Sequence, residues 1–584
     1  MNKFLPAVAL ILMLFASPFI IDGTDACTGF YVGSDVSETG GTLIGQTADT
    51  GAYSPAVYRI VDSSNVPGRS LVGTNGFVYA LPDTTYRYYT SDIYHSPGAP
   101  LGCGNGVTND KGLAYTGSIT AYTSTAALTA DPLITSGLGE ELAGEIVGAC
   151  CSNAKEAVQL IASIIDTYGS SERNIYIFAD KTEAWYMESY SGHQYAAVKL
   201  PKDKVAFFGN EFGLVYLEEF GDDVITSANF KKLADDSGFA VYDDGKLNLM
   251  KTYQRPLQDY GHMRTWMGHQ KLAPTQFSSD YDVNTVYPLL FAPDDKVSVK
   301  EIADLLRNRF EGTEYCPDVT GKSVRVAGIE NTSLAHILEI RSDLPDEMCT
   351  IKWSCIGPTV YGMFIPCSSG TLSLDDAFAA QTYKYSVDDG TAYGLMKLLN
   401  SMLTESGFLT DTSDVSKDIL TDGVRKYWSD MEVYYSAVYE EVISKAKEYY
   451  QNSPQDALDY LTSYTKGIQR DQMIEARAIY EESKLALMMN TSTKASRSAV
   501  SPFIDVEVLA ERFGWTCTVT DERLTFVRGS DTITIDAPEM YVENGTITHG
   551  ESSKSIKVHI ADGRYRIQYT DAAVFIPEFD TPAR

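Results

Sequence analysis

Hydrophobic and polar residues alternate in short runs over the first third of the chain, and turn residues separate the runs. Alternation with a period of two residues predicts β-strands joined in hairpins. The first hairpin turns at Gly40 and Gly41, and a second one turns at Asn109. The predicted strands are Thr28–Val32, 42–45 and the two halves of 104–119, and then Asn174–Ala179, 184–190 and 194–199.

Apolar residues recur every three or four positions elsewhere, which predicts amphipathic helices. In Ala154–Tyr168, for example, Ala157, Ile161 and Ile165 fall on one face. Residues 422–490 form long stretches of the same kind, rich in Tyr, Glu and Lys. The other predicted elements are a first helical piece within 138–168, helices at 297–309 and 505–513, and strands at 333–341, 350–355, 516–519, 523–528 and 531–535.

Strands in hairpins with helices between them indicate an α+β fold with mixed sheets rather than one parallel sheet. A length of 584 residues suits one large domain with accessories. We expect a signal peptide at 1–26, a main domain at 27–420, a helical extension packed on it at 421–493, a linker at 494–500 and a small α+β module at 501–584.

The first residues have the composition of an export signal. Lys3 precedes an apolar run over 5–15, and a short polar stretch ends at the small residue Ala26. Residues 4–21 approach the length of a membrane span, so an uncleaved N-terminal anchor is the alternative. With cleavage we expect no further span, and a protein that is secreted or held in the periplasm or cell envelope.

The formal net charge is −31, spread along the chain, and the hydrophobic content of 44% is that of a globular protein. An acidic surface repels nucleic acid and anionic lipid, so we expect neither as a partner. The composition leaves the oligomeric state open, a homo-oligomer included.

Metal and cofactor motifs are not evident in the sequence. The nine cysteines have no paired CxxC spacing, which argues against a zinc ribbon. Cysteines 349, 355 and 367 are close enough to form disulfides, although the sequence does not define a pairing. His193 falls in a strand turn, and His262 with His269 has no acidic neighbour in sequence. We therefore expect no metal and no cofactor.

Cys27 follows Ala26, the expected cleavage point, and would then carry both a thiol and a free α-amino group. Their ordinary pKa values are about 8.5 and about 7.7–8, so the amine can accept the thiol proton near neutral pH. Nucleophile and base thus reside on one residue. One alternative is a lipid-attachment cysteine, which Asp22 and Asp25 disfavour; another is cleavage near Gly23, which leaves Cys27 structural.

A series of short blocks covers residues 27–490: 27–35, 40–45 with Asp49, 106–114, 154–169, 179–188, 192–195, 207–211, 309–313, 332–333, 341–345 and Trp353. In this order and spacing the chain resembles the C69-type dipeptidases. That family belongs to the N-terminal-nucleophile hydrolases and is related to penicillin V and bile-salt acylases.

The resemblance implies a four-layer αββα sandwich with Cys27 at the end of a central strand. It implies that Asp49 holds the α-amino group by a charge-assisted hydrogen bond. It also implies that Asn109 and Asn210 donate to the oxyanion of acyl transfer and orient the amine. Asn109 begins a tight turn and Asn210 follows a glycine, so a conformational role is the alternative for both.

One position departs from the family, because Gln46 stands where the family carries arginine, three residues before Asp49. A neutral amide does not supply the positive charge that would stabilise a thiolate or a substrate carboxylate. We expect Gln46 and Arg264, the candidate replacement cation, at the substrate-binding site.

These inferences predict an exported cysteine-type dipeptidase that hydrolyses short peptides through Cys27, with its own α-amino group as base. The alternatives are an amide acylase of the penicillin V or bile-salt type, and an inactive scaffold that acts as an envelope binding protein. Residues 501–584 weakly resemble modules appended to exported bacterial enzymes, so we expect a spacer or a cell-envelope contact there.

Overall fold

The computed structural model describes residues 27–50, 54–99, 101–321, 323–384, 387–404 and 415–490, and in the C-terminal region 503–506, 515–520, 523–536, 542–550, 552–561 and 564–568. The expected signal peptide at 1–26, the linker at 494–500 and most of the expected helix at 505–513 lie outside the described residues.

One antiparallel sheet of six strands contains the start of the described chain. The expected first hairpin forms its β1 and β2, and the second hairpin strand continues past residue 45 to Asp49. In spatial order the strands are β12 (Val205–Phe208), β1 (Thr28–Val32), β2 (Thr42–Asp49), β16 (Thr332–Ile340), β17 (Thr350–Ile356) and β18 (Ile365–Ser368). Cys27 therefore lies at the head of an interior strand.

A second antiparallel sheet of eight strands faces the first. Phe30 and Ile44 from the first sheet share one fully buried cluster with Ile119 and Ile177 from the second. In spatial order its strands are β13 (Val224–Thr226), β11 (Tyr195–Leu200), β10 (Ala184–Ser189), β9 (Asn174–Ala179), β8 (Ala114–Thr120), β7 (Cys103–Asn109), β6 (Tyr88–Ile93) and β3 (Ala56–Val61).

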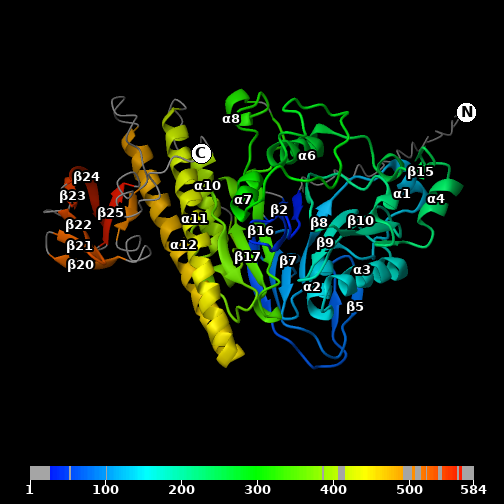
Figure 1. The fold of residues 1–584 in the computed structure, drawn as a ribbon, viewed down its shortest axis with the longest axis horizontal. Helices are drawn as coiled ribbons and strands as arrows, with labels where there is room; N and C mark the ends of the chain where they lie inside the picture. The colour runs from blue at the N-terminus through cyan, green and yellow to red at the C-terminus, as the bar shows by residue number, and fades with distance from the viewer. Residues whose placement is uncertain are drawn as a thin grey trace, which may run out of the picture.

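Helices cover the outer faces of both sheets, as Figure 1 shows. On the eight-stranded sheet lie α2 (Glu140–Cys150) and α3 (Ala154–Tyr168), and the predicted face of α3 is buried. On the six-stranded sheet lie α6 (Asp259–Leu272), α7 (Val299–Leu306), α10 (Ala392–Thr404), α11 (Val415–Asn452) and α12 (Pro454–Asn490). The order helix, sheet, sheet, helix confirms the expected αββα sandwich.

Several shorter elements connect these layers. They are α1 (Thr125–Ala130), α4 (Phe230–Asp236), α5 (Leu249–Tyr253), α8 (Pro317–Thr320), α9 (Asp376–Ala379), the 3-10 turns Leu217–Phe220, Asp346–Met348 and Thr359–Tyr361, and the two-stranded pairs β4 (Ser70–Val72) with β5 (Val78–Ala80) and β14 (Tyr242–Asp243) with β15 (Lys246–Leu247). The helix expected at 297–309 is shorter, because Ser298 and Glu301 form a capping box at its start and it ends before Arg307.

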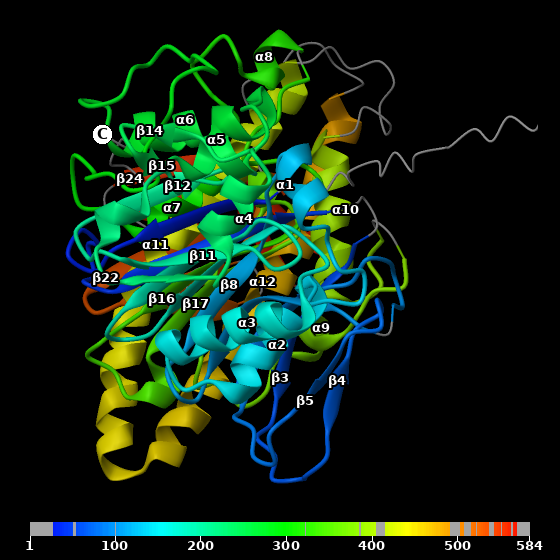
Figure 2. The same ribbon diagram turned by 90° about the vertical axis from the view of Figure 1, so that its right-hand side faces the viewer.

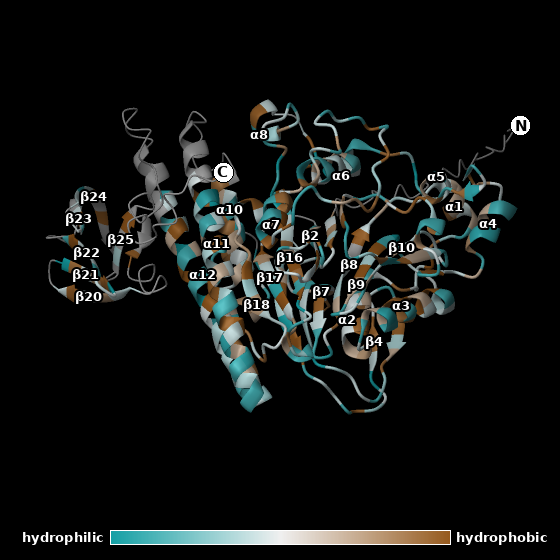
Figure 3. Cartoon of the chain, viewed as in Figure 1, coloured by the Kyte–Doolittle hydropathy of each residue, from teal (hydrophilic) through white to brown (hydrophobic). Residues whose placement is uncertain are grey.

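The two long helices α11 and α12 lie side by side, with the C-terminal strands on the far side of α12 (Figures 1 and 2). Figure 3 shows that the end of this pair that protrudes beyond the sheets is mostly hydrophilic. Among the described residues, the C-terminal region is one antiparallel sheet: β19 (Phe503–Asp505), β25 (Arg564–Gln568), β24 (Ser552–Ala561), β23 (Val542–His549), β22 (Asp531–Asp536), β21 (Arg523–Arg528) and β20 (Thr516–Thr520).

The structure also bears on the expected disulfides and on membrane-spanning helices. Cys349, Cys355 and Cys367 are buried thiols rather than disulfides. Cys355 pairs across the ladder with Ala335 and Cys367 with Lys352, so the two cysteines do not face each other. Within the described ranges, no helix combines the length and the apolar composition that a membrane crossing requires.

Candidate active site

Cys27 is 6% exposed at the head of β1, and the N-terminal half of α6 meets it there. The carbonyl oxygen of Cys27 accepts a hydrogen bond of 2.6 Å from Nη1 of Arg264. The same nitrogen lies 2.9 Å from the Oγ1 of Thr28. A buried guanidinium thus fixes Cys27 and the first residue of β1.

Arg264 joins Cys27 to a second candidate residue. Its Nη2 donates to the Oδ1 of Asn210 at 2.5 Å and to the carbonyl of Tyr260 at 3.1 Å. Complete burial lowers the pKa of Arg264, and the nearby Arg325 lowers it further, while Asp49, Tyr260 and Cys27 oppose the shift. A guanidinium remains protonated in proteins, so Arg264 places a positive charge beside Cys27.

Asp49 is fully buried at the end of β2. Its Oδ2 accepts from the Oγ1 of Thr47 at 2.9 Å and from Arg325, and its Oδ1 accepts from Thr332 at 2.6 Å. The Oγ1 of Thr47 in turn accepts from the backbone nitrogen of Thr28 at 3.1 Å. Asp49 is therefore connected to the residue after Cys27 through one threonine hydroxyl.

Asn210 reaches the site because β12 turns sharply at Gly209 against α6. A Cβ at Gly209 would lie 2.3 Å from the carbonyl oxygen of Gly261, so only glycine fits this approach. The Nδ2 of Asn210 donates to the carbonyl of Thr120, the last residue of β8, at 2.7 Å. Asn210 thus links the ends of both sheets to Arg264.

Asn109 is not brought to Cys27. It ends β7 at the turn into β8, whereas Asn210 bonds to Thr120 at the other end of β8, about 20 Å away along a seven-residue strand. Its Nδ2 donates to the carbonyls of residues 148 and 151, and its Oδ1 accepts from the backbone nitrogens of residues 111 and 113. The conformational alternative therefore describes Asn109, and its expected oxyanion role is corrected.

Gln46 lies between the sheets. Side chains alternate along a strand, so Gln46 is on the face of β2 opposite to Asp49. Its Nε2 donates to the Oδ1 of Asn105 at 2.5 Å and to the carbonyl of Gly117 at 2.9 Å, both in the eight-stranded sheet. This amide joins the two layers, whereas Arg264, the candidate replacement cation, bonds to the Cys27 carbonyl and Arg325 bonds to Asp49.

Arg325 and Tyr260 also lie at this site, and neither is among the residues expected there from the sequence. The Cζ atoms of Arg264 and Arg325 lie 5.7 and 5.9 Å from the centre of the Tyr260 ring, so one aromatic ring is close to two guanidinium groups. Tyr260 is one turn before Arg264 on α6, a spacing the sequence does show. Arg325 is in a loop far from Asp49 in sequence and has no local signal.

His262 and His269, which were not expected to bind a metal, have specific hydrogen-bond partners. The Nδ1 of His262 lies 3.1 Å from both carboxylate oxygens of Glu211, so the expectation that it lacks an acidic neighbour is wrong. Burial opposes protonation of His262, but Glu211 raises its pKa overall. Burial lowers the pKa of His269 to about 4, and both of its ring nitrogens lie 2.8 Å from backbone carbonyls.

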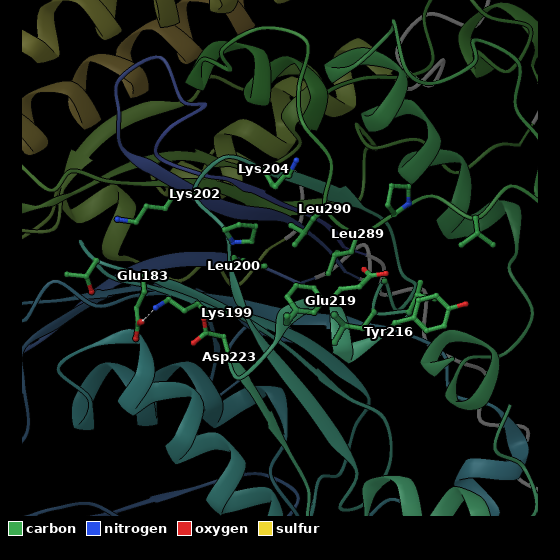
Figure 4. A pocket seen from close by; sticks show the side chains of 18 residues that line it. Glu183, Lys199, Leu200, Lys202, Lys204, Tyr216, Glu219, Asp223, Leu289 and Leu290 are labelled. Atoms are coloured by element: carbon green, nitrogen blue, oxygen red, sulfur yellow. Dashed lines mark ion pairs between the residues drawn. The ribbon is translucent and has the colours of Figure 1, made fainter. Parts of the chain in front are cut away.

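Two cavities adjoin the Cys27 end of the sandwich and share Tyr122 as a wall. One of about 20 Å³ is lined by Asn210 and Tyr260, and one of about 400 Å³ is lined by Thr120. A further cavity, of about 830 Å³, is drawn in Figure 4. It borders Lys202 and Lys204, just before the end of β12 that pairs with Val32, so it lies at the other end of β1 from Cys27.

Two face-to-face antiparallel sheets between helices, with a cysteine at the head of an interior strand, define the fold class of the N-terminal-nucleophile hydrolases. The model of peptidase family C69 matches residues 26–419. The chain belongs to this family and is by class a peptide hydrolase, which confirms the resemblance seen in the sequence.

The individual relatives share less than a third of their aligned residues with this chain. A probable dipeptidase B of Streptococcus pyogenes serotype M1 is 29% identical over 490 residues, which are 80% of this chain and 95% of the relative. A probable dipeptidase B of Lactococcus lactis is 27% identical over 359 residues, 58% of this chain and 74% of that protein. A conjugated bile acid hydrolase mutant of Clostridium perfringens is 13% identical, with a TM-score of 0.24 over 56% of this chain and 89% of the other.

Proposed function

We propose that the protein is an exported dipeptidase whose nucleophile is Cys27, freed as the first residue when residues 1–26 are removed. The observation that carries the proposal is one guanidinium, Arg264, bonded to both the Cys27 carbonyl and the Asn210 amide. The relatives named as probable dipeptidases support a short peptide as substrate.

In the first half-reaction the α-amino group of Cys27 takes the thiol proton while the sulfur attacks the scissile carbonyl carbon. The oxyanion forms near Asn210, whose amide nitrogen has a second hydrogen beyond the one given to Thr120. When the C–N bond breaks, the ammonium of Cys27 returns its proton to the leaving amine. A thioester with Cys27 remains.

In the second half-reaction water attacks the thioester, and the same amine first accepts and then returns a proton to sulfur. Asp49 supports this cycle through Thr47, because its carboxylate stabilises positive charge at the head of β1. Arg264 and Arg325 stabilise negative charge on sulfur and oxygen, which Gln46 does not. The cavity of about 400 Å³ beyond Tyr122 has the volume of a small-ligand site.

The test combines mass spectrometry of the exported protein with a substrate panel. We expect a mature chain that starts at Cys27 and is alkylated by iodoacetamide. We expect Cys27→Ala to abolish dipeptide hydrolysis with an unchanged circular dichroism spectrum, and Cys27→Ser to retain a trace of it.

Cys150→Ala is the matched control, because this half-buried thiol lies at the end of α2 and away from the site. Full activity in Cys27→Ala, or a mature start upstream of Cys27, would overturn the mechanism. Turnover of acylated amines but not of dipeptides would favour an acylase, and no turnover of either would favour an inactive binding scaffold.

A further inference from the structure

A histidine, a cysteine and a glutamate converge beside the cavity of about 400 Å³, outside the Cys27 network. His95 is in the loop after β6, Cys103 is the first residue of β7, and Glu140 is the first residue of α2. The separations along the chain match no zinc motif, so no sequence pattern groups the three residues.

The three donor atoms form a nearly equilateral triangle. The Sγ of Cys103 lies 3.5 Å from the Nε2 of His95 and 3.9 Å from the Oε1 of Glu140, and the last two atoms are 3.8 Å apart. Metal–ligand distances of about 2.0–2.3 Å in a tetrahedral zinc site put donor atoms roughly 3.3–3.6 Å apart. The observed triangle needs to contract by only a few tenths of an ångström.

The surroundings favour a cation with one open coordination position. Glu141 and Glu172 line the same cavity, and apart from His95 its lining contains one basic residue, Arg173. The N-terminus of α2 opposes a cation by its dipole, but the backbone nitrogen of Glu140 already donates to the Glu172 carboxylate at 3.0 Å. Cys103 is buried and the His95 side chain is 48% exposed, so solvent reaches the triangle from one side.

We propose that His95, Cys103 and Glu140 bind Zn²⁺ through Nε2, Sγ and Oε1, with the fourth position open to the cavity for water or a ligand. A thiolate with an imidazole selects zinc over magnesium or calcium, which prefer oxygen donors. Binding releases the thiol proton of Cys103. The ion ties the β6–β7 connection to α2, next to Tyr122, which lines both this cavity and the small cavity beside Asn210.

The experiment is a Zn²⁺ titration of the full, chelator-stripped protein in competition with a chromophoric chelator. We expect one equivalent to bind. Cys103→Ser and His95→Ala should each weaken binding at least about 100-fold, since even loss of an outer-shell partner costs 10–100-fold. Cys150→Ser, a thiol at the other end of α2, is the matched control and should bind as the unchanged protein does.

A second measurement guards against misfolded variants. With Co²⁺ in place of Zn²⁺ we expect a thiolate-to-metal charge-transfer absorption that Cys103→Ser removes and Cys150→Ser keeps. Less than stoichiometric Zn²⁺ binding, or equal affinity in Cys103→Ser and the unchanged protein, would overturn the proposal and leave Cys103 as a packing residue. Cys27→Ala should bind Zn²⁺ normally, so this test is independent of the hydrolytic mechanism.

Discussion

The two ends of the β-sandwich are made by the same strands, but their polar groups have different partners. At the Cys27 end, Asn210 bonds to the charged Arg264, which also holds the Cys27 carbonyl. At the other end, the four side-chain hydrogen bonds of Asn109 are all made with backbone groups of its own turn and of α2 with its C-terminal cap. An asparagine whose side chain is satisfied by backbone groups stabilises a fold, whereas Asn210, oriented by a charge next to Cys27, is the one that we propose to act in the reaction.

The largest expected contrast between the two ends is in catalysis. Asn210→Ala removes a proposed oxyanion donor and should lower kcat by about 10²–10³, with a smaller change in KM. Steady-state kinetics on a dipeptide measures this, and Asn109→Ala is the matched control. Equal losses of kcat in the two variants would contradict a catalytic role for Asn210 that Asn109 does not share.

Asn109→Ala should act on stability instead. It leaves two carbonyls and two backbone N–H groups at the β7–β8 turn and α2 without their partner, which we expect to cost about 3 kcal/mol of unfolding free energy. Urea unfolding measures the loss, and kcat per folded molecule should stay unchanged. A variant as stable as the parent would show that water replaces the amide.

Local patterns predicted the hairpin at Cys27, the turn at Asn109, the buried face of α3 and the long helices. These features depend on neighbours in sequence. The roles of Asn109 and Asn210 depend instead on which end of the sandwich each turn occupies, and that follows only from strand register. Arg325 is 276 residues from Asp49, so no local signal could have paired them.

The expected substrate-binding role of Gln46 depended on where the second predicted strand ends. The sequence indicated a strand only to residue 45, but β2 continues to Asp49. Within one strand, residues three apart lie on opposite faces, so Gln46 and Asp49 have different neighbours although Gln46 pairs with Gly29, two residues after Cys27. A longer predicted strand would have placed Gln46 between the sheets.

The middle of the sandwich holds an ionisable group, the amine of Lys352. Lys352 on β17 is fully buried, and its Nζ donates to the carbonyl of Gly106 at 2.8 Å and lies 4.1 Å from the centre of the Tyr89 ring. Burial lowers its pKa to about 7, against about 10.4 in an unfolded chain. Between these values the unfolded state binds more protons than the folded state.

The contribution of Lys352 to stability is therefore fully present above pH 10 and is lost as the pH falls through 7. Over pH 7 to 9 we expect unfolding free energy to rise by about 1–2 kcal/mol more in the parent than in Lys352→Met. Urea unfolding of both proteins at the two pH values measures this difference and cancels the other titrating groups. If unfolding free energy changed equally with pH in the parent and in Lys352→Met, the Lys352 ammonium would stay charged between the sheets. Lys352 would then resemble Arg264 at the Cys27 end, which is buried and charged.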